Sequence, residues 1–320
     1  MSLTIIIPTY KNIEFLPELV SSIESSKYGE EYEVLIGIDY CYDTLNYIYG
    51  NQFPENFKFY FFTENKGPYI IKNTLADLSK FGKLLFFDSD DFMMEDLLNE
   101  VDTKLGSYSV IKPKYINFTD VNGVKEYKQE KPQFGEGVFG IQKELFLEMN
   151  GFEGWKVAAD SDFMGRLYKT DVKILHTPHI LFHRRQHKNS LTVHPDTNLS
   201  SRLRGQYHFL SRQKTSKNII NEKFIVGNYN VVDFKNKELL NSGVEMVEET
   251  ELNDIEIKRL KHESISNIFL NGSKEPKVLS DPKTIDYGKI NSRSNHQISS
   301  QLGSALRKAK LEDIKKSSRR

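Results

Sequence analysis

The chain has 320 residues, 38% of them hydrophobic and 28% charged, and its 44 Lys and Arg residues balance its 44 Asp and Glu residues. This length suits one large domain with a smaller one, and the apolar runs are too short for a transmembrane segment. Cys41 is the one cysteine, which excludes an internal disulfide and a multi-cysteine zinc site. Because no basic segment precedes the first apolar run, we expect no signal peptide and a cytoplasmic protein, with peripheral membrane contact as an option.

The first hundred residues alternate between strand and helix patterns. Runs of apolar residues predict strands at 3–7, 33–39, 57–62 and 84–88, and helical patterns lie at 13–23 and 69–78. Strands separated by helices imply a parallel sheet, which binds ligands at the carboxyl ends of its strands. Several polar or turn-forming segments fall at those ends, namely Pro8-Thr9-Tyr10, Asp39, Asn65 to Gly67, and Asp88 to Asp91.

Three carboxylates follow the fourth predicted strand, in the segment Asp88-Ser89-Asp90-Asp91. Such a cluster is costly because like charges repel. Carboxylate oxygens suit Mg²⁺ or Mn²⁺, which can in turn hold the phosphates of a nucleotide. The alternative is that the cluster caps a helix predicted over residues 92–101. A single Asp would be enough for that purpose.

Residues 109–190 show a mixed pattern. Strands are predicted at 109–118 and 125–128 around a turn at 120–123, and again at 173–176 and 179–184. Glycines are frequent over 135–141, and helices are predicted at 143–149 and 160–170. Beyond residue 215 the patterns weaken, with strands predicted within 224–234 and helices at 245–257, 258–270 and 302–314. Residues 281–320 carry 10 Lys and Arg against 4 Asp and Glu.

Six segments, in this order, resemble the motifs of inverting GT-A glycosyltransferases of the family 2 type. They are TIIIPTYKN, IGIDYCYDT, ENKGPYIIKNTL, FFDSDD (the DxD metal motif), GFEGWKVAADSDFMGRLY and LFHRRQHKNSLT, and they cover roughly residues 1 to 192. The resemblance implies an α/β nucleotide-diphospho-sugar transferase fold with a mainly parallel central sheet. The catalytic domain would span residues 1–215, with a nucleotide-binding half at 1–108 and an acceptor half at 109–215. A less regular, α-rich extension with a basic tail would occupy 216–320.

The resemblance also implies an activity and a set of site residues. The enzyme would move a sugar from a UDP-linked donor to a hydroxyl of a glycan, using Mn²⁺ or Mg²⁺. Asp90, Asp88 and His187 would hold the metal. His183 is the second choice of histidine ligand, and the preferred interpretation of it is an ordinary strand residue. The donor nucleotide would contact Pro8, Thr9, Tyr10, Asp39, Asn65, Gly67, Lys72, Asn73, Asp88, Ser89 and Arg185. Lys72 stands where the family more often has Arg.

The base that accepts the acceptor's proton matches Asp160. The family usually has Glu immediately before it, whereas this chain has Ala159, and Asp162 follows two residues later. Residues two positions apart face different sides of a helix, so Asp160 and Asp162 remain alternatives. Trp155 would stack on an acceptor sugar, unless it belongs to the core.

Other functions remain open at this point. Nucleotidyl transfer would need a glycine-rich loop after the first strand, and Pro8 to Asn12 lacks glycine. The absence of Glu at position 159 allows a catalytically weak GT-A-like binding module. The basic tail would be a solvated terminus, or it would contact an anionic surface, a membrane or nucleic acid. The last option would fit a transferase that acts on modified bases of DNA, as phage-type glucosyltransferases do.

Overall fold

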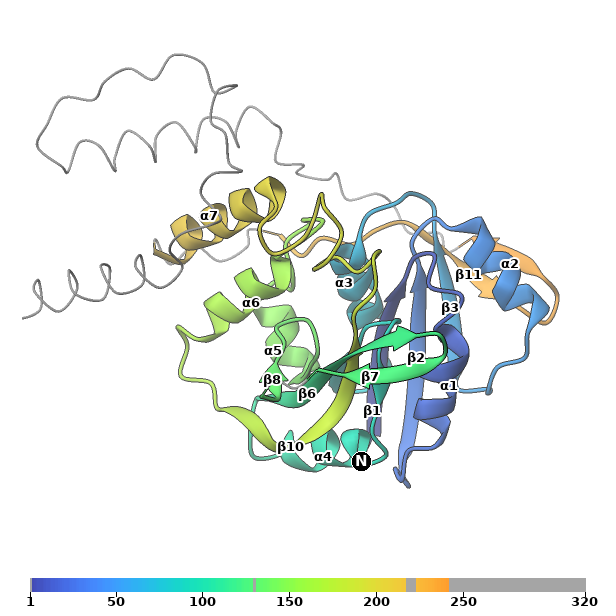
Figure 1. The fold of residues 1–320 in the computed structure, drawn as a ribbon, viewed down its shortest axis with the longest axis horizontal. Helices are drawn as coiled ribbons and strands as arrows, with labels where there is room; N and C mark the ends of the chain where they lie inside the picture. The colour runs from blue at the N-terminus through green and yellow to red at the C-terminus, as the bar shows by residue number, and fades with distance from the viewer. Residues whose placement is uncertain (1, 129–130, 217–222, 242–320) are drawn as a thin grey trace, which may run out of the picture. The chain divides into compact units, whose positions relative to one another are not determined.

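The computed structural model describes residues 2–128, 131–216 and 223–241 (Figure 1). All of them belong to the first of the two compact units into which the chain divides, Met1–His262. The helices predicted at 245–257, 258–270 and 302–314 and the basic tail at 281–320 lie outside the described residues. In the part of the chain that is described, no helix is both long and apolar enough to cross a bilayer.

The N-terminal strands form the parallel arrangement that the sequence predicts. Strands β3, β2, β1 and β4 are neighbours in that order, and each pair is parallel. Their bounds are β1 Ser2–Thr9, β2 Glu31–Ile38, β3 Phe57–Phe62 and β4 Lys83–Phe86. The helices between them are α1 Leu16–Glu24, α2 Tyr42–Gly50 and α3 Pro68–Leu78. These crossovers bring the carboxyl ends of the strands to one edge of the sheet.

The sheet as a whole is mixed, so the prediction of a mainly parallel sheet is wrong. Beyond β4 the order continues β9-β6-β10-β5, and on the other side β11 and β12 follow β3. Most of these added pairs are antiparallel, with β10 and β6 as the parallel exception. The tight turn at Asn122-Gly123 joins β6 to β7 and so requires an antiparallel pair. The added strands are β5 Phe92–Met93, β6 Val110–Val121, β7 Val124–Tyr127, β8 Gln133–Phe134, β9 Phe139–Gln142, β10 Ile174–Arg185, β11 Tyr229–Asp233 and β12 Glu238–Asn241.

Two predicted elements have different bounds in the structure. The helix predicted over 92–101 begins only at Leu97, because Phe92 and Met93 pair with β10 as a short strand. The strands predicted at 173–176 and 179–184 are one strand, β10, whose register is irregular around Pro178. Proline lacks the N–H that a regular ladder needs. The remaining helices are α4 Leu97–Lys104, α5 Lys143–Glu148, α6 Ala159–Leu167 and α7 Arg202–Ser216.

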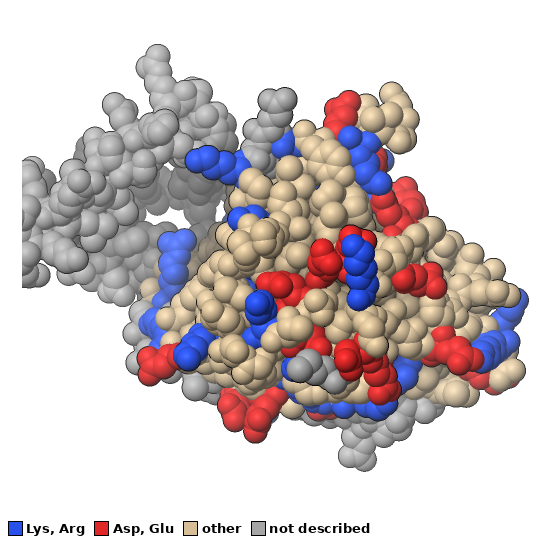
Figure 2. All heavy atoms as spheres, turned by 90° about the horizontal axis from the view of Figure 1, so that it is seen from below, with Lys and Arg blue, Asp and Glu red and all other residues tan. Residues whose placement is uncertain are grey.

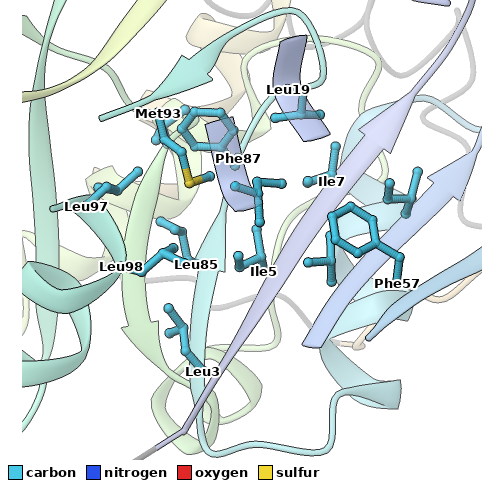
Figure 3. Packing of buried hydrophobic residues seen from close by; sticks show 14 of the residues in the cluster. Leu3, Ile5, Ile7, Leu19, Phe57, Leu85, Phe87, Met93, Leu97 and Leu98 are labelled. Atoms are coloured by element: carbon cyan, nitrogen blue, oxygen red, sulfur yellow. The ribbon is translucent and has the colours of Figure 1, made fainter. Parts of the chain in front are cut away.

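The core lies on both faces of the sheet. Leu3, Ile5 and Ile7 of β1 pack with Leu85 and Phe87 on one face, as Figure 3 shows. The alternate residue Ile6 packs on the other face with residues of α3, α5 and α6. Because both faces are covered, β1 is a continuous apolar run, as buried parallel strands usually are. The predicted domain boundary at 215 stays a prediction, and residues 223–241 of the predicted extension supply β11 and β12 to this sheet.

Candidate active site

The carboxyl ends of β1, β2 and β4 bring polar side chains to one edge of the sheet. Thr9 ends β1, Asp39 follows β2, and Asp88 lies two residues after the end of β4. Pro8 and Thr9 are buried, whereas Tyr10 is 44% exposed. The buried hydroxyl of Thr9 has no hydrogen-bond partner among the described residues. A buried polar atom without a partner is unfavourable, so this edge of the sheet is suited to a polar ligand.

Asp39 holds the turn that leads into helix α3. Its two carboxylate oxygens accept hydrogen bonds from the backbone N–H groups of Lys66, at 2.7 Å, and Gly67, at 3.0 Å. Gly67 is the N-cap residue of α3 and has a φ of 80°, a conformation that glycine adopts easily. Asn65 donates to the backbone oxygen of Asp39 at 3.4 Å. Burial raises the pKa of Asp39 to about 6, although the two backbone donors oppose this rise.

The four residues of the carboxylate segment have four different partners. Ser89 accepts a hydrogen bond from Asn12, and Asp88 from Lys72, both at 2.9 Å. The partners of Asp90 and Asp91 come from the end of β10 and the residues after it. The N-cap residue of α4 is Asp96, five residues after the cluster ends. The interpretation of the cluster as only a helix cap is therefore wrong.

Lys72 holds the carboxylate of Asp88 in place. Its side chain is only 2% exposed, and its Nζ donates to Oδ1 of Asp88 at 2.9 Å and to the backbone oxygen of Gly137 at 3.0 Å. The Asp88 side chain is 39% exposed. The lysine is thus a buried cation that orients an accessible carboxylate and ties the loop before β9 to it.

Asp90 and His187 form the pair best suited to a metal ion. Oδ2 of Asp90 lies 2.9 Å from Nε2 of His187, and the two side chains are 19% and 16% exposed. The ring of Phe15 packs against the imidazole at 4.8 Å. Within the described residues, no group of three or more His, Cys, Asp or Glu side chains forms a complete metal cage. A divalent ion held by one carboxylate and one imidazole would keep positions for substrate phosphates, as Mg²⁺ sites commonly do.

Asp91 is buried behind this pair. Its Oδ1 accepts a hydrogen bond from the backbone N–H of Arg185 at 2.8 Å. Burial raises the pKa of Asp91 well above its ordinary value, and the charges of Asp90 and Asp88 add to that rise. Asp91 therefore supports the segment from behind and adds less repulsion than a fully charged third carboxylate would.

Arg185 is engaged entirely within the protein. Its guanidinium donates to the backbone oxygen of Asp90 at 2.8 Å and forms ion pairs with Glu18 and Asp120. The rings of Phe15 and Phe118 lie 4.5 and 4.6 Å from it. With only 4% of its side chain exposed, Arg185 is not placed to bind a diphosphate, contrary to the prediction.

The neighbouring Arg184 faces the carboxylates instead. Successive residues of a strand point to opposite faces. Arg184 donates to Oγ1 of Thr192 at 2.9 Å and to the hydroxyl of Tyr115 at 3.4 Å. Its charge interacts with Asp91 and Asp88. Of the two arginines, Arg184 is the cation on the site's side of β10.

Two other predicted residues lie outside the site. The imidazole of His183 contacts the hydroxyl of Tyr127 at 2.9 Å and packs on Phe92, away from Asp90. Asn73 is completely buried, and its amide exchanges hydrogen bonds with the backbone of Phe152 and donates to Ile225. The structure thus gives His183 a strand position and Asn73 a supporting role, rather than contacts with metal or nucleotide.

Asp160 faces Asp88 across Gly137. A Cβ atom placed on Gly137 would lie 3.3 Å from Oδ2 of Asp160 and 3.5 Å from Oδ2 of Asp88. The other oxygen of Asp160 accepts hydrogen bonds from the hydroxyl of Tyr69 and the N–H of Ser161, both at 2.9 Å. One oxygen of Asp160 is therefore held in place, and the other points towards the space beside Asp88.

Asp162 is fully buried and points elsewhere. Its Oδ2 pairs with Nε of Arg166 at 2.9 Å, and Arg166 also donates to the backbone oxygens of Met149 and Gly151. This ion pair fastens the Asn150-Gly151 turn, which precedes the loop leading to α6. Of the two candidate bases, Asp160 is partly exposed to solvent and Asp162 is not.

Trp155 is not available to an acceptor. The side chain is 4% exposed, and Tyr207 of α7 stacks on the indole with ring centres 4.8 Å apart. The structure therefore overturns the prediction that Trp155 forms a sugar platform and supports its alternative, a place in the core.

Sequence reasoning missed Tyr69 and Gly137. Both lie in segments that the sequence singles out, the donor motif and the glycine-rich stretch, but nothing local signals that they meet Asp160. Tyr69 and Asp160 are 91 residues apart. Burial raises the pKa of the Tyr69 hydroxyl well above its ordinary value, and the Asp160 charge adds to this, so Tyr69 acts here as a hydrogen-bond donor.

Comparison with known proteins gives one family. The family described as Glycosyl transferase family 2 matches residues 4–164, half of the chain, and no curated protein matches it. Residues 1–349 of S. aureus TarS in complex with UDP-GlcNAc align with a TM-score of 0.53 and 18% identity, over 68% of this chain and 66% of that one. The mannosyltransferase PcManGT from Pyrobaculum calidifontis, in complex with GDP-Man and Mn²⁺, aligns with a TM-score of 0.51 and 14% identity, over 67% and 64%. The chain thus spans just under two thirds of each, and the likeness concerns the fold.

Proposed function

Because the chain belongs to glycosyl transferase family 2, we propose that it is a metal-dependent inverting glycosyltransferase. It takes a sugar from a nucleotide-sugar donor, UDP-linked, and transfers it to a hydroxyl of a glycan acceptor. The observation that carries this proposal is the arrangement around Gly137. There a supported, accessible carboxylate, Asp160, faces Asp88, which belongs to the same segment as the Asp90–His187 pair.

The nucleoside side of the site is the edge formed by β1 and β2. Thr9 offers a buried hydroxyl without a partner, and Asp39 offers a carboxylate that could accept from a base N–H. The Asn65 to Gly67 turn beside it begins α3, whose N-terminus favours negative charge. A nucleotide sugar as donor is also supported by the two structures of the same fold, solved with UDP-GlcNAc and with GDP-Man.

The residues present could hold a divalent metal ion. Asp90 would supply a carboxylate oxygen and His187 an imidazole nitrogen, and these two atoms lie 2.9 Å apart. Carboxylate oxygen is the donor that Mg²⁺ and Mn²⁺ prefer. Mn²⁺ in the mannosyltransferase structure is in keeping with this choice of ion. When bound, the ion supplies positive charge against the charge that develops on the leaving diphosphate.

The chain's own residues would perform the other steps. Oδ2 of Asp160 takes the proton from the acceptor hydroxyl as its oxygen forms a bond to the anomeric carbon. The bond from that carbon to the diphosphate oxygen breaks at the same time, on the opposite side, so the configuration inverts. Tyr69 and the N–H of Ser161 hold Asp160 in orientation. Arg184 lies close enough to Asp88 and Asp91 to add positive charge on the leaving-group side.

The acceptor that we propose is a glycan rather than DNA. On the face that Figure 2 shows, Lys and Arg side chains are interspersed with Asp and Glu. Binding to a phosphate backbone needs a surface of one positive sign, so this face is not suited to bind DNA. The basic tail on which the DNA and membrane-surface alternatives depend lies outside the described residues.

A donor screen tests the proposal. Purified full-length protein is incubated with a panel of nucleotide sugars and Mn²⁺ or Mg²⁺, and nucleotide release is measured. We expect the wild-type protein to release UDP from a UDP-sugar. The rate of release should be at least about a hundredfold lower in Asp90→Asn, and it should be lost when the metal is removed by a chelator. Asp77→Asn, which changes an exposed carboxylate on α3, is the matched control and should keep the rate.

Two results would contradict the proposal. Full activity of Asp90→Asn, or full activity after exhaustive chelation, would exclude the metal-dependent mechanism. Binding of UDP without release from any donor in the panel would favour the catalytically weak binding module.

A further inference from the structure

Helix α7 is held against the loop and helix that carry Asp160. It packs on α6, and Figure 1 shows the two helices side by side. Tyr207 of α7 stacks on Trp155, and Lys214 forms an ion pair with Glu153. These contacts fix one face of α7 next to the acceptor half of the site.

The Arg and Lys side chains of α7 are all positively charged, and the helix has no acidic side chain. Its sequence, RLRGQYHFLSRQKTS, contains three Arg and one Lys and no Asp or Glu. Arg204, His208 and Arg212 are spaced four residues apart and therefore share one stripe of the helix. Like charges at this spacing destabilise a helix, so an anion bound along the stripe would relieve the repulsion.

This stripe lies close to Asp160. The charges of Arg204 and Arg212 both act on His208, and so does the charge of Asp160. Arg204 also acts on Tyr69, which is hydrogen-bonded to Asp160. Burial lowers the pKa of His208, followed by the effect of Arg204. The Arg204 and His208 end of the stripe is thus next to the proposed base, and Arg212 lies one turn further along the helix.

Two members of the stripe are free to bind. Arg204 is buried and donates to the backbone oxygens of Thr197 and Leu191. In contrast, neither the half-buried ring of His208 nor the exposed guanidinium of Arg212 has a hydrogen-bond or ion-pair partner in the described part of the chain. Arg204 therefore anchors the stripe, and His208 and Arg212 offer donors.

We propose that Arg204, His208 and Arg212 form an acceptor subsite for an anionic group, a phosphate or a carboxylate, that the acceptor carries near its reacting hydroxyl. The inference rests on the proposed function, since it assigns the substrate class of that same site. A negative group so close to Asp160 would be repelled without cations to offset the carboxylate. Guanidinium groups are the side chains best suited to phosphate and carboxylate.

The test follows His208 by NMR in full-length protein without divalent metal. Inorganic phosphate, or acetate as the carboxylate probe, is titrated while the pH midpoint of the His208 ring signal is recorded. His208→Gln assigns the signal. We expect a saturable move of the midpoint to higher pH, because a bound anion stabilises the imidazolium. Whether phosphate, acetate or both raise the His208 midpoint shows which anionic group the subsite accepts.

Arg212→Gln should weaken the binding of that probe about fivefold, the size expected of one exposed ion pair. Arg202→Gln is the matched control, because Arg202 is exposed on the same helix but lies off the stripe. No move of the His208 midpoint with either probe, or equal weakening in both variants, would overturn the inference. So would a midpoint shift caused by UDP at the same concentration and lost in Arg212→Gln, which would assign the stripe to the donor.

Calorimetry with UDP and Mg²⁺ separates this inference from the proposed function. If UDP binds and His208 does not respond to phosphate or acetate, only the anionic subsite fails. If His208 responds and no nucleotide binds, the proposed function fails and the anion site stands.

Discussion

Arg185 donates hydrogen bonds to both Asp90 and Asp91. Its Nε donates to the backbone oxygen of Asp90 at 2.8 Å, and its own backbone N–H donates to the carboxylate of Asp91 at 2.8 Å. The same guanidinium reaches Glu18 on α1 and Asp120 on β6. Arg185 therefore connects three elements to the carboxylate segment and positions it, without facing the space that a diphosphate would occupy.

We expect Arg185→Met to lower the free energy of unfolding by about 1 to 2 kcal/mol, since the partly exposed Glu18 and Asp120 lose their ion-pair partner and the backbone oxygen of Asp90 loses a donor. The segment that carries Asp90 would also loosen, so Mn²⁺ binding should weaken in the protein without nucleotide. Urea denaturation and the EPR signal of free Mn²⁺ measure the two effects.

Arg184→Met is the contrasting variant. It removes the cation that faces Asp88 and Asp91, so we expect weaker UDP binding with a smaller loss of stability. If Arg185→Met kept its stability and Mn²⁺ affinity but lost UDP binding, the diphosphate role that the sequence predicts for Arg185 would be restored.

The strand ends could be predicted because they depend on local sequence. Apolar runs that end in Pro8-Thr9, Asp39 and Asp88 each mark a strand and its end, and crossovers in a parallel sheet must place those ends together. The burial of Thr9 and the hydrogen bonds from Lys66 and Gly67 to Asp39 follow from that arrangement. The edge of the sheet where we propose that the nucleoside binds could therefore be predicted from the sequence alone.

The rest depends on contacts between distant segments. Asp90 and His187 are 97 residues apart, and only a family resemblance could pair them. Whether Arg184 or Arg185 faces the site is a question of strand register around the irregularity at Pro178. The core position of Trp155 depends on α7, which the sequence pattern did not reveal, since its apolar residues form no clear stripe.

The second prediction concerns pH. Burial raises the pKa of Asp39 from its ordinary 3.8 to about 6, so the folded state binds a proton more readily than the unfolded one between these values. The stabilisation from this group is complete below pH 3.8 and is lost as the pH rises through 6. A carboxylate is needed to accept from a base N–H, so UDP affinity should fall by up to about tenfold per pH unit below 6.

Calorimetric titration of UDP from pH 5 to 7 measures this dependence. In Asp39→Asn the affinity should be lower and nearly constant over that range. The same slope in wild type and Asp39→Asn would show that another group is responsible.

The third prediction separates the two candidate bases. An Asn at position 160 keeps an oxygen that can accept from Tyr69 and Ser161, so Asp160→Asn should retain stability but lose about 10² to 10⁴ in kcat. Asp162→Asn removes the charge that the buried Arg166 faces, so it should lower the free energy of unfolding by about 3 kcal/mol. Rates of transfer and urea denaturation of both variants decide the assignment. An active, stable Asp160→Asn beside a stable, inactive Asp162→Asn would reverse it.

The fourth prediction concerns the space between the donor and acceptor carboxylates. Gly137→Ala would place a methyl group 3.3 Å from Oδ2 of Asp160 and 3.5 Å from Oδ2 of Asp88. The φ angle at Gly137 is not in the region that favours glycine, so the backbone accepts alanine without strain. We expect the unfolding free energy to change by less than about 1 kcal/mol, while kcat/KM falls about tenfold or more because the acceptor hydroxyl can no longer approach both carboxylates.

Gly135→Ala is the matched control for this change. Its added methyl group would meet only the ring of Tyr115, at an ordinary contact distance of 3.5 Å, in the same glycine-rich segment. Initial rates over a range of acceptor concentrations, with thermal denaturation of both variants, make the comparison. Equal losses of activity in the two variants would mean that the segment needs flexibility as a whole. A selective loss in Gly137→Ala places the reacting atoms between Asp88 and Asp160, because only there does the methyl group compete with them for space.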